Sequence, residues 1–315
     1  MGLLGYVIRR VGMSIPTLLL ISILVFLLVH VMPGGPLAMY AHQPNITPAQ
    51  LKVIAHQLGI DRPLPEQYVT WLGNMLSGHF GYSFTYGVRV VDLIGERMPP
   101  TLLLMGLSFV IAVVTSITIG TISAVYHHTW IDRLLSGLSY VGLGLPSFWL
   151  GLILIEIFGV HLGWLPISGM GSGSFTSVVA HLVMPVITLA VLFVAQEARY
   201  VRSSMVDVLG RRFIVTARAK GLTNGATVIR HGLRNGLIPV VTVLAMDAAT
   251  LFGGAVITES IFSWPGIGRL FLGAVLQGDY PIMLALITLL SGLIVLANIA
   301  ADVLYAVIDP RVHYA

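Results

Sequence analysis

The sequence predicts an all-α integral membrane protein with six transmembrane helices. Charged residues are 10% of the 315 residues and the mean hydropathy is +0.91, whereas about a quarter of the residues of a soluble domain are charged. Apolar runs of the length that spans a bilayer as a helix follow one another along the chain. Because no internal repeat, low-complexity tract or interdomain linker separates them, we expect one membrane domain over residues 1–315.

The first expected span follows Arg9 and Arg10 and is a retained helix. A cleaved secretory signal peptide is the alternative, but the run is long and no A-x-A cleavage site follows it. Proline removes a helical hydrogen bond, so kinks are expected at Pro146 and Pro185 in two later spans. The expected spans are residues 11–31, 102–125, 134–158, 177–196, 237–258 and 282–306.

Residues 32–100 form the only long stretch of mixed polarity and are expected to lie outside the cell membrane. They contain several prolines, followed by a helical pattern with aromatic residues over residues 66–78. This helix could lie at the membrane interface as an amphipathic segment. A small packed extracytoplasmic cap explains the pattern equally well.

The distribution of Lys and Arg predicts the orientation. With the N-terminus inside, segments on the cytoplasmic side carry twelve of the 17 basic residues and outside segments carry five. Eight of the twelve lie in one segment, residues 199–236. Both termini and this segment are therefore expected in the cytoplasm.

Composition also excludes several kinds of site. The chain has no cysteine, so a disulfide framework and thiolate metal sites are excluded. Neither of its two lysines, Lys52 and Lys220, lies in a phosphate-binding G-x-x-x-x-G-K-[ST] motif, and no H-E-x-x-H or G-x-S-x-G occurs. We expect no cofactor in this chain. If ATP drives its activity, a partner binds the nucleotide and Mg²⁺.

The stretch Ile214–Pro239 is a polar, basic island between two apolar runs. Ile214–Lys220 can form the end of one helix, and Gly221 suits a left-handed break. Thr223 can then cap a second helix. The stretch therefore predicts a helix–break–helix elbow by which a soluble partner could move membrane helices.

This elbow resembles the signature loop of ABC importer permeases, in which EAA, three residues, Gly and nine residues precede I-x-L-P. Here Val215-Thr216-Ala217 stands for EAA, His231, Leu233 and Arg234 occupy the later positions, and the proline is delayed to Pro239. The form TARAKGL…RHxLRNxLIP is similar to one subfamily, the permeases of dipeptide, oligopeptide and nickel importers. That resemblance extends over the chain through these further motifs: Tyr6-x-x-Arg9-Arg10, Pro33-Gly34-x-Pro36, Leu58-Gly59-x-Asp61-Arg62-Pro63-Leu64-Pro65, Trp164-Leu165-Pro166, Glu259-x-Ile261-Phe262-x-Trp264-Pro265-Gly266, Asp279-Tyr280-Pro281 and Asp309-Pro310-Arg311.

The resemblance implies the type I importer permease fold and a non-catalytic subunit in a bacterial or archaeal cytoplasmic membrane. Its partners would be a second, related permease in a heterodimer, two ATPases that bind ATP and Mg²⁺, and an extracytoplasmic solute-binding protein. Peptides are the implied substrate, with nickel or a nickel chelate as the alternative within the family. A carrier or channel working without ATPases is the alternative from another class, but a carrier should show inverted repeats and a membrane acid–base relay.

The resemblance and the elbow pattern together predict which residues contact two of the partners, the binding protein and the ATPase. The external loop would meet the binding protein through Glu259, Trp264 and Arg269, and residues 32–100 are a second candidate for that contact. The residues at the tip of the elbow, which are mostly small and uncharged, would contact the ATPase: Ala217, Ala219, Lys220, Gly221, Leu222, Thr223, Asn224, Gly225, Ala226 and Arg230.

Acidic residues within expected spans are costly and often functional. Asp247 is a candidate for the translocation pathway, and pairing with a polar group on a neighbouring helix is the alternative. Glu156 and Asp302, near span ends, are expected to cap helices or bond between helices. The basic residues preceding the elbow, Arg199, Arg202, Arg211 and Arg212, are expected to contact anionic lipid headgroups.

Overall fold

A computed structural model describes residues 3–31, 35–37, 46–57, 59–247 and 251–308. Within these ranges the chain is helical, with one isolated bridge between Tyr82 and Arg89. The elements are α1 (Leu3–Val31), η1 (Gly35–Leu37), α3 (Pro48–Gln57), α4 (Leu64–Leu76), α5 (Val90–Val125), α6 (Trp130–Gly144), α7 (Ser147–Leu154), the π-helix η2 (Ile155–His161), α8 (Phe175–Leu209), α9 (Arg212–Ala219), α10 (Asn224–Thr227), the π-helix η3 (Val228–Leu233), α11 (Arg234–Asp247), α12 (Leu251–Ile261), α13 (Ile267–Gln277) and α14 (Tyr280–Ile308).

The all-α prediction is confirmed, whereas the count of six spans stays a prediction. In the described part, four helices are long and apolar enough to cross a membrane: Val7–Val31, Val90–Val125, Phe175–Leu209 and Tyr280–Val303. A fifth span results if the bent pair of α6 with α7 and η2 is counted as one. The run predicted as residues 237–258 is divided between α11 and α12, and residues 248–250 lie outside the described ranges.

The two internal prolines have different consequences. At Pro146 the helix breaks, and the axes on either side differ by 101°. At Pro185 the helix continues, since α8 is unbroken from Phe175 to Leu209. The expected kink at Pro146 is thus confirmed as a full break, whereas Pro185 lies within a continuous helix.

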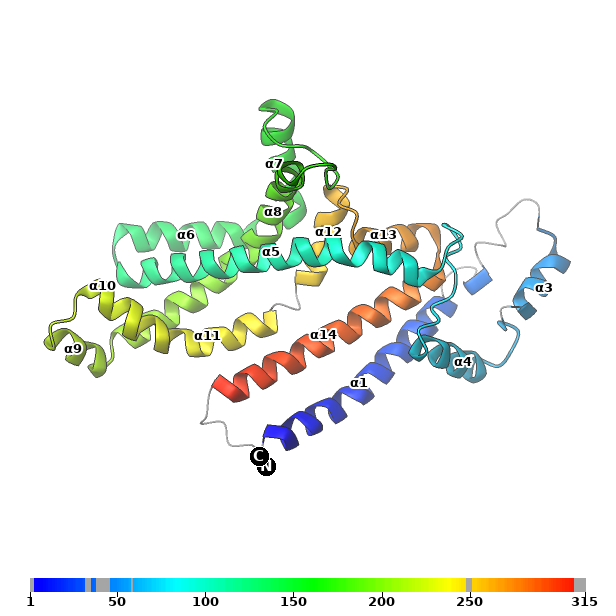
Figure 1. Ribbon diagram of the computed structural model, residues 1–315, viewed down its shortest axis with the longest axis horizontal. Helices are drawn as coiled ribbons and strands as arrows, with labels where there is room; N and C mark the ends of the chain where they lie inside the picture. Colours follow the sequence, from blue (N-terminus) through cyan, green and yellow to red (C-terminus); the bar gives the residue numbers. More distant parts are fainter. Residues whose placement is uncertain (1–2, 32–34, 38–45, 58, 248–250, 309–315) are drawn as a thin grey trace.

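Helices α5 and α8 form the centre of the bundle (Figure 1). The face of α5 toward α8 is lined by small residues four positions apart, which lets two helix backbones approach closely. A Cβ at Gly120 would lie 2.6 Å from the Ala198 carbonyl oxygen and from Val201, so a larger residue would separate the helices. The buried small residues on this stripe are Ser108, Ala112, Ser116, Gly120 and Ala124.

The first and last helices of the chain pack on each other. Helix α14 packs along α1, and Arg10 forms an ion pair with Asp302 between these two helices. The expected interhelical role of Asp302 is confirmed. Glu156 is exposed, and its carboxylate lies 3.2 Å from Nδ1 of His161.

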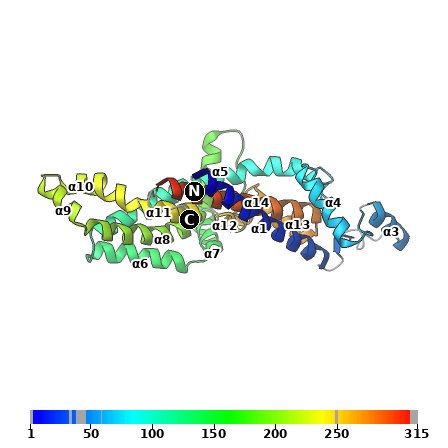
Figure 2. The ribbon, with the colours of Figure 1, turned by 90° about the horizontal axis from the view of Figure 1, so that it is seen from below.

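The region between the first two membrane helices is packed against α1. The hydroxyls of Tyr68 in α4 and Ser22 are 2.8 Å apart, and the rings of Tyr68 and Trp71 contact Phe26. Of the two explanations for the aromatic pattern, these contacts favour the packed cap. Figures 1 and 2 both place α3 and α4 at one end of the molecule and α9 and α10 at the opposite end.

Candidate functional site: a helical elbow and its clamp

The elbow is formed by α9, α10 and η3, between helices α8 and α11 (Figure 1). Its break lies at Gly221, where φ is +86°, in the left-handed region. The amide of Leu222 donates to the carbonyl of Ala217, and the amide of Gly221 donates to that of Arg218 at 2.9 Å. These two bonds are the Schellman pattern, which ends a helix and satisfies its last carbonyl groups. The predicted break is confirmed at the predicted glycine.

Thr223 starts the next helix. Its backbone is extended, and its Oγ1 accepts a hydrogen bond from the amide of Ala226 at 3.3 Å. The hydroxyl of Thr227 donates to the Thr223 carbonyl at 2.9 Å, one turn away. Capping the free amides in this way is typically worth about 1 kcal/mol. The predicted N-cap is confirmed.

The inner face of the elbow is packed against α8. Ile214, Ala217 and Thr227 are buried. A Cβ at Gly232 would meet Met205 of α8 at 3.2 Å, and one at Gly236 would meet the Met205 sulfur at 2.6 Å. These glycines therefore let η3 and α11 approach α8, so the elbow and α8 share one packed base.

The outer face is exposed and small. Of the ten predicted contact residues, Ala217 is buried and Leu222 is half-buried, while the other eight are exposed: Ala219, Lys220, Gly221, Thr223, Asn224, Gly225, Ala226 and Arg230. Nothing lies within 4 Å of a Cβ built at Gly221 or Gly225. The tip therefore offers uncovered backbone and small side chains, between Lys220 and Arg230.

A buried ion pair holds the base of the elbow to the turn between α5 and α6. Nε and Nη2 of Arg202 in α8 donate to the two carboxylate oxygens of Asp132, at 2.6 and 2.8 Å. Asp132 is buried and also accepts from the hydroxyl of Ser123 at 2.5 Å and from the amide of His128. Nδ1 of His127 lies 3.1 Å from both Asp132 and Arg202. We call Asp132, Arg202, Ser123 and His127 the clamp.

Three of the four basic residues before the elbow have protein partners. Arg202 belongs to the clamp, Arg199 lies 4.8 Å above the ring of Tyr140, and Arg211 pairs with Asp207 at 2.7 Å. Contact of the four residues, Arg212 included, with anionic lipid headgroups stays a prediction. Sequence reasoning missed the clamp because Arg202 and Asp132 are 70 positions apart.

The loop between α12 and α13, which is expected to be external, is organised around Glu259. Its carboxylate accepts from the hydroxyl of Thr101 at 2.6 Å and from the amide of Arg269 at 3.0 Å. The indole of Trp264 donates to the Pro100 carbonyl at 3.0 Å. Glu259 and Trp264 are both 0% exposed, so in this structure they hold the loop against α5, and Arg269 is the exposed one of the three residues predicted to meet a binding protein.

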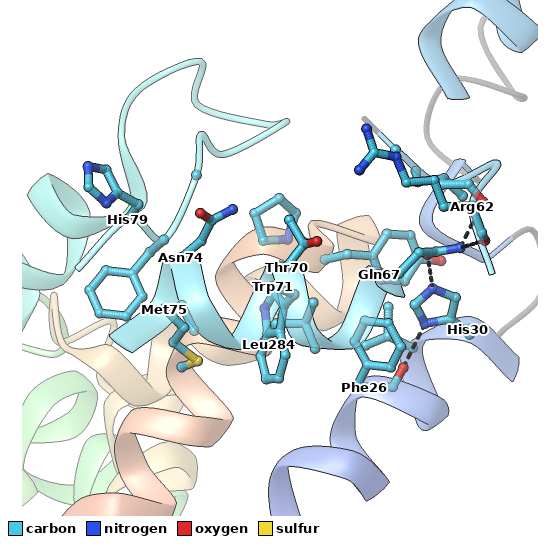
Figure 3. Close-up of a pocket in the computed structure, with 18 of the residues that line it drawn as sticks. Phe26, His30, Arg62, Gln67, Thr70, Trp71, Asn74, Met75, His79 and Leu284 are labelled. Atoms are coloured by element: carbon cyan, nitrogen blue, oxygen red, sulfur yellow. Dashed lines mark hydrogen bonds between the residues drawn. The ribbon is translucent and has the colours of Figure 1, made fainter. Parts of the chain in front are cut away.

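A cavity of about 460 Å³ opens at the same end of the molecule, between α1, α4 and α14 (Figure 3). Gln67 lies at its edge: its amide nitrogen donates to the carbonyls of Ile60 and Arg62, and its oxygen lies 3.0 Å from Nε2 of His30. Figure 3 shows Trp71 and Leu284 projecting toward the same space. The cavity is thus apolar on the helix side and polar at the edge formed by Gln67.

One further hydrogen bond lies at the polar edge of this cavity. Nδ1 of His56 donates to Asp61 at 2.6 Å, and this hydrogen bond holds the pKa of the Asp61 carboxyl below its usual range. Asp61 therefore stays negatively charged to lower pH than an isolated aspartate, beside the exposed Arg62.

Asp247, predicted as a pathway residue, lies at the end of α11 and is half-buried. Its Oδ2 accepts a hydrogen bond from the amide nitrogen of Gln196 in α8 at 2.7 Å. This bond confirms the alternative expectation, that Asp247 pairs with a polar group on a neighbouring helix. The pathway role stays a prediction.

Comparison with known families assigns the chain. The model described as "Binding-protein-dependent transport system inner membrane component" matches residues 116–314, and the corresponding N-terminal model matches residues 3–105. The chain belongs to this family of transport permeases. ABC permeases of this kind are non-catalytic membrane subunits that work with ATPase subunits and binding proteins.

Two relatives are similar to the permease over nearly its whole length. The oligopeptide transport system permease protein AppB of Bacillus subtilis (strain 168) is 41% identical over 315 residues, covering 98% of this chain and 99% of its own. The glutathione transport system permease protein GsiC of Escherichia coli (strain K12) is 41% identical over 312 residues, covering 99% and 100%. Among solved structures, the inward-facing MetNI methionine ABC transporter matches 69% of this chain and 96% of its own, with a TM-score of 0.57 at 20% identity, so it supports the fold.

Proposed function

We propose that this permease forms half of the translocation pathway of an ATP-driven importer of di- and oligopeptides. In this proposal residues 214–239 couple it to an ATPase. The observation that carries the coupling role is the elbow: its tip is exposed and small, while its base is packed against Met205 of α8. A groove on a soluble partner could receive the tip, and a force applied there would be transmitted to α8.

The proposed assembly contains a second, homologous permease in a heterodimer, two ATPases and an extracytoplasmic solute-binding protein. ATP and Mg²⁺ bind to the ATPases, and this chain holds no cofactor. Both termini and the elbow lie in the cytoplasm, an orientation supported by the twelve basic residues assigned to that side. The cavity beside Gln67 then faces outward.

Peptides are the proposed substrate because the two relatives, 41% identical over nearly the whole chain, are named for oligopeptide and glutathione transport. Labelled peptide and labelled nickel, offered separately to the assembled transporter, distinguish the two substrates considered for this family. Uptake of peptide and not of nickel is expected. Uptake of nickel alone would contradict the peptide assignment while leaving the coupling role intact.

In the proposed cycle, closure of the ATPases displaces the tip, and the clamp carries α5 and α6 with α8. The two permeases then move between inward-open and outward-open arrangements. A binding protein favours the outward-open arrangement only to the extent that it binds that state more tightly. Arg269 and the surface around the cavity are the proposed contacts for it.

The coupling role can be tested by cross-linking, because the chain has no cysteine of its own. In the assembled transporter, Ala226→Cys should form a cross-link to an ATPase subunit. Gly95→Cys is the control: Gly95 is exposed, helical, and has no atom within 4 Å of a Cβ, but it lies in the first turns of α5 at the opposite end. A cross-link from position 95 and none from position 226 would refute the assignment.

A functional test uses bulk and charge at the tip. Gly221→Trp or Ala226→Arg should abolish uptake and uncouple ATP hydrolysis while the protein still inserts in the membrane. Normal uptake by both variants would contradict the docking role of the tip.

A further inference from the structure

Glu197 is a buried acidic residue that neither the elbow nor the external loop uses. It lies in α8, is 0% exposed within this single chain, and neither of its carboxylate oxygens has a hydrogen-bond donor in the described part of the structure. A buried carboxylate without a donor or a cation is strongly unfavourable. Glu197 must therefore be neutral or be satisfied by something that the neighbouring side chains do not supply.

The group that faces Glu197 is another carboxyl. Asp247 at the end of α11 interacts directly with Glu197, and the same Asp247 accepts from the amide of Gln196 at 2.7 Å. Two carboxylates are both acceptors, so they can hydrogen-bond to each other only when one of them carries a proton. The contact between Glu197 and Asp247 thus requires a hydrogen between the two carboxyl groups.

The cations nearest in sequence are engaged elsewhere. Arg199 lies over the ring of Tyr140, and Arg202 is bound in the clamp. On the helices that pack against α8, the segment 102–125 of α5 and the whole of α7 have no ionisable side chain. The other ionisable side chains of the elements packed against α8 lie farther along them: Asp92, Glu96, Arg97, Asp132, Arg133, Tyr140, Arg230, His231, Arg234 and Glu259.

From this geometry we propose that Glu197 and Asp247 together form a proton-binding site inside the helix bundle. One carboxyl group carries the proton and, through it, donates a hydrogen bond to the other carboxylate. That carboxylate also accepts the hydrogen bond from the Gln196 amide. The site does not depend on which substrate the permease carries, since it follows from the contact between α8 and α11 alone.

The place of this site gives it a mechanical consequence. Helices α8 and α11 flank the elbow on its two sides. Near the elbow they are joined by the Ser204 hydroxyl, which donates to the Gly236 carbonyl at 2.6 Å. The carboxyl pair joins the same two helices at the far end of α11. If movement of the elbow separates α8 from α11, water reaches the pair, the proton passes to that water, and the two negative charges then repel each other. Proton release and helix separation are thus one event.

The test is infrared spectroscopy of the assembled transporter in lipid nanodiscs, which detects the carbonyl stretch of protonated carboxyl groups. Glu197→Gln keeps the side-chain volume and donates an amide hydrogen to Asp247, so it should assemble and lose one protonated-carboxyl band. Glu156→Gln is the control, since that carboxylate is 60% exposed and far from the pair; it should keep the band.

A second variant keeps the test decisive if Glu197→Gln does not assemble. Asp247→Asn places the new amide against Glu197, which then ionises, so the same band should be lost. Persistence of the band in whichever of these variants assembles would overturn the proposal. Loss of the band in Glu156→Gln as well would also overturn it, because the signal would not come from the pair. Neither outcome bears on peptide transport, which the uptake assay tests separately.

Discussion

The left-handed conformation of Gly221 makes a prediction that depends on the backbone alone. Gly221 has φ of +86° and nothing within 4 Å of a Cβ built on it. Gly221→Ala therefore adds no clash with a neighbour, and its cost is that of placing an L-residue in the left-handed region, about 1–2 kcal/mol. If the bent elbow is in equilibrium with a straighter one, that cost lowers the ratio of bent to straight by roughly 5- to 30-fold.

Gly225 provides the matched control four residues away. It is exposed, it too has no atom within 4 Å of a Cβ, and it lies in helix α10 rather than at a left-handed position. Gly225→Ala should be neutral or slightly favourable, because Ala exceeds Gly in helix interiors by roughly 0.5–1 kcal/mol. Gly221→Asn should fall between the two, since Asn tolerates the left-handed region better than Ala.

The assay is peptide uptake per ATP hydrolysed by the assembled transporter in proteoliposomes. Gly221→Ala should lower this ratio several-fold with normal membrane insertion, and Gly225→Ala should leave it unchanged. Equal defects in the two alanine variants would show that the tip is sensitive to any added methyl group. A Gly221→Ala transporter with full coupling would show that the left-handed break is not required.

Three further variants test the packing that supports the elbow and the loop, each by the melting temperature of the purified complex. Gly120→Ala places a Cβ 2.6 Å from α8 and should destabilise by about 1–3 kcal/mol; an unchanged melting temperature would refute the close packing of α5 on α8. Gly266→Ala places a Cβ 2.2 Å from the carboxylate that binds the start of α13 and should destabilise similarly, whereas Gly106→Ala, with nothing within 4 Å, serves as the control for both. Asp132→Asn leaves Arg202 without its charged partner and should cost about 3 kcal/mol, toward the low end for a buried pair because Arg202 is partly exposed; a loss below about 1 kcal/mol would show that the clamp is not a structural element.

The elbow could be predicted from the sequence because its determinants are local. A left-handed break requires glycine, and a helix start is favoured by Thr, so Gly221 and Thr223 together indicate the bend without knowledge of any distant residue. The break at Pro146 is predictable for the same reason. Burial of Glu259 and Trp264 was not predictable, because it depends on Thr101 and Pro100, more than 150 positions earlier.

One non-local feature did leave a local signal. The face of α5 that packs on α8 is marked by small residues at every fourth position from Ser108 to Ala124, a spacing that places them on one side of a helix. The clamp and the Glu197–Asp247 pair left no comparable signal, since each joins residues 50 or more positions apart.

These contacts imply that the two arms of the elbow differ in what they can move. Helix α8 has 35 residues and is therefore about 50 Å long, so one continuous helix runs from Phe175 to the elbow. It is held to α5 by the small-residue stripe and to the α5–α6 turn by Arg202. The described part of α11, Arg234–Asp247, has 14 residues and is about 20 Å long. A force on the tip should therefore move α5, α6 and α8 as one body, while α11 can move relative to them only by breaking the hydrogen bonds that join it to α8, Gln196–Asp247 and Ser204–Gly236. The interface between α8 and α11 is thus where relative movement must begin. The proposed carboxyl pair lies at the end of this interface that is farther from the elbow.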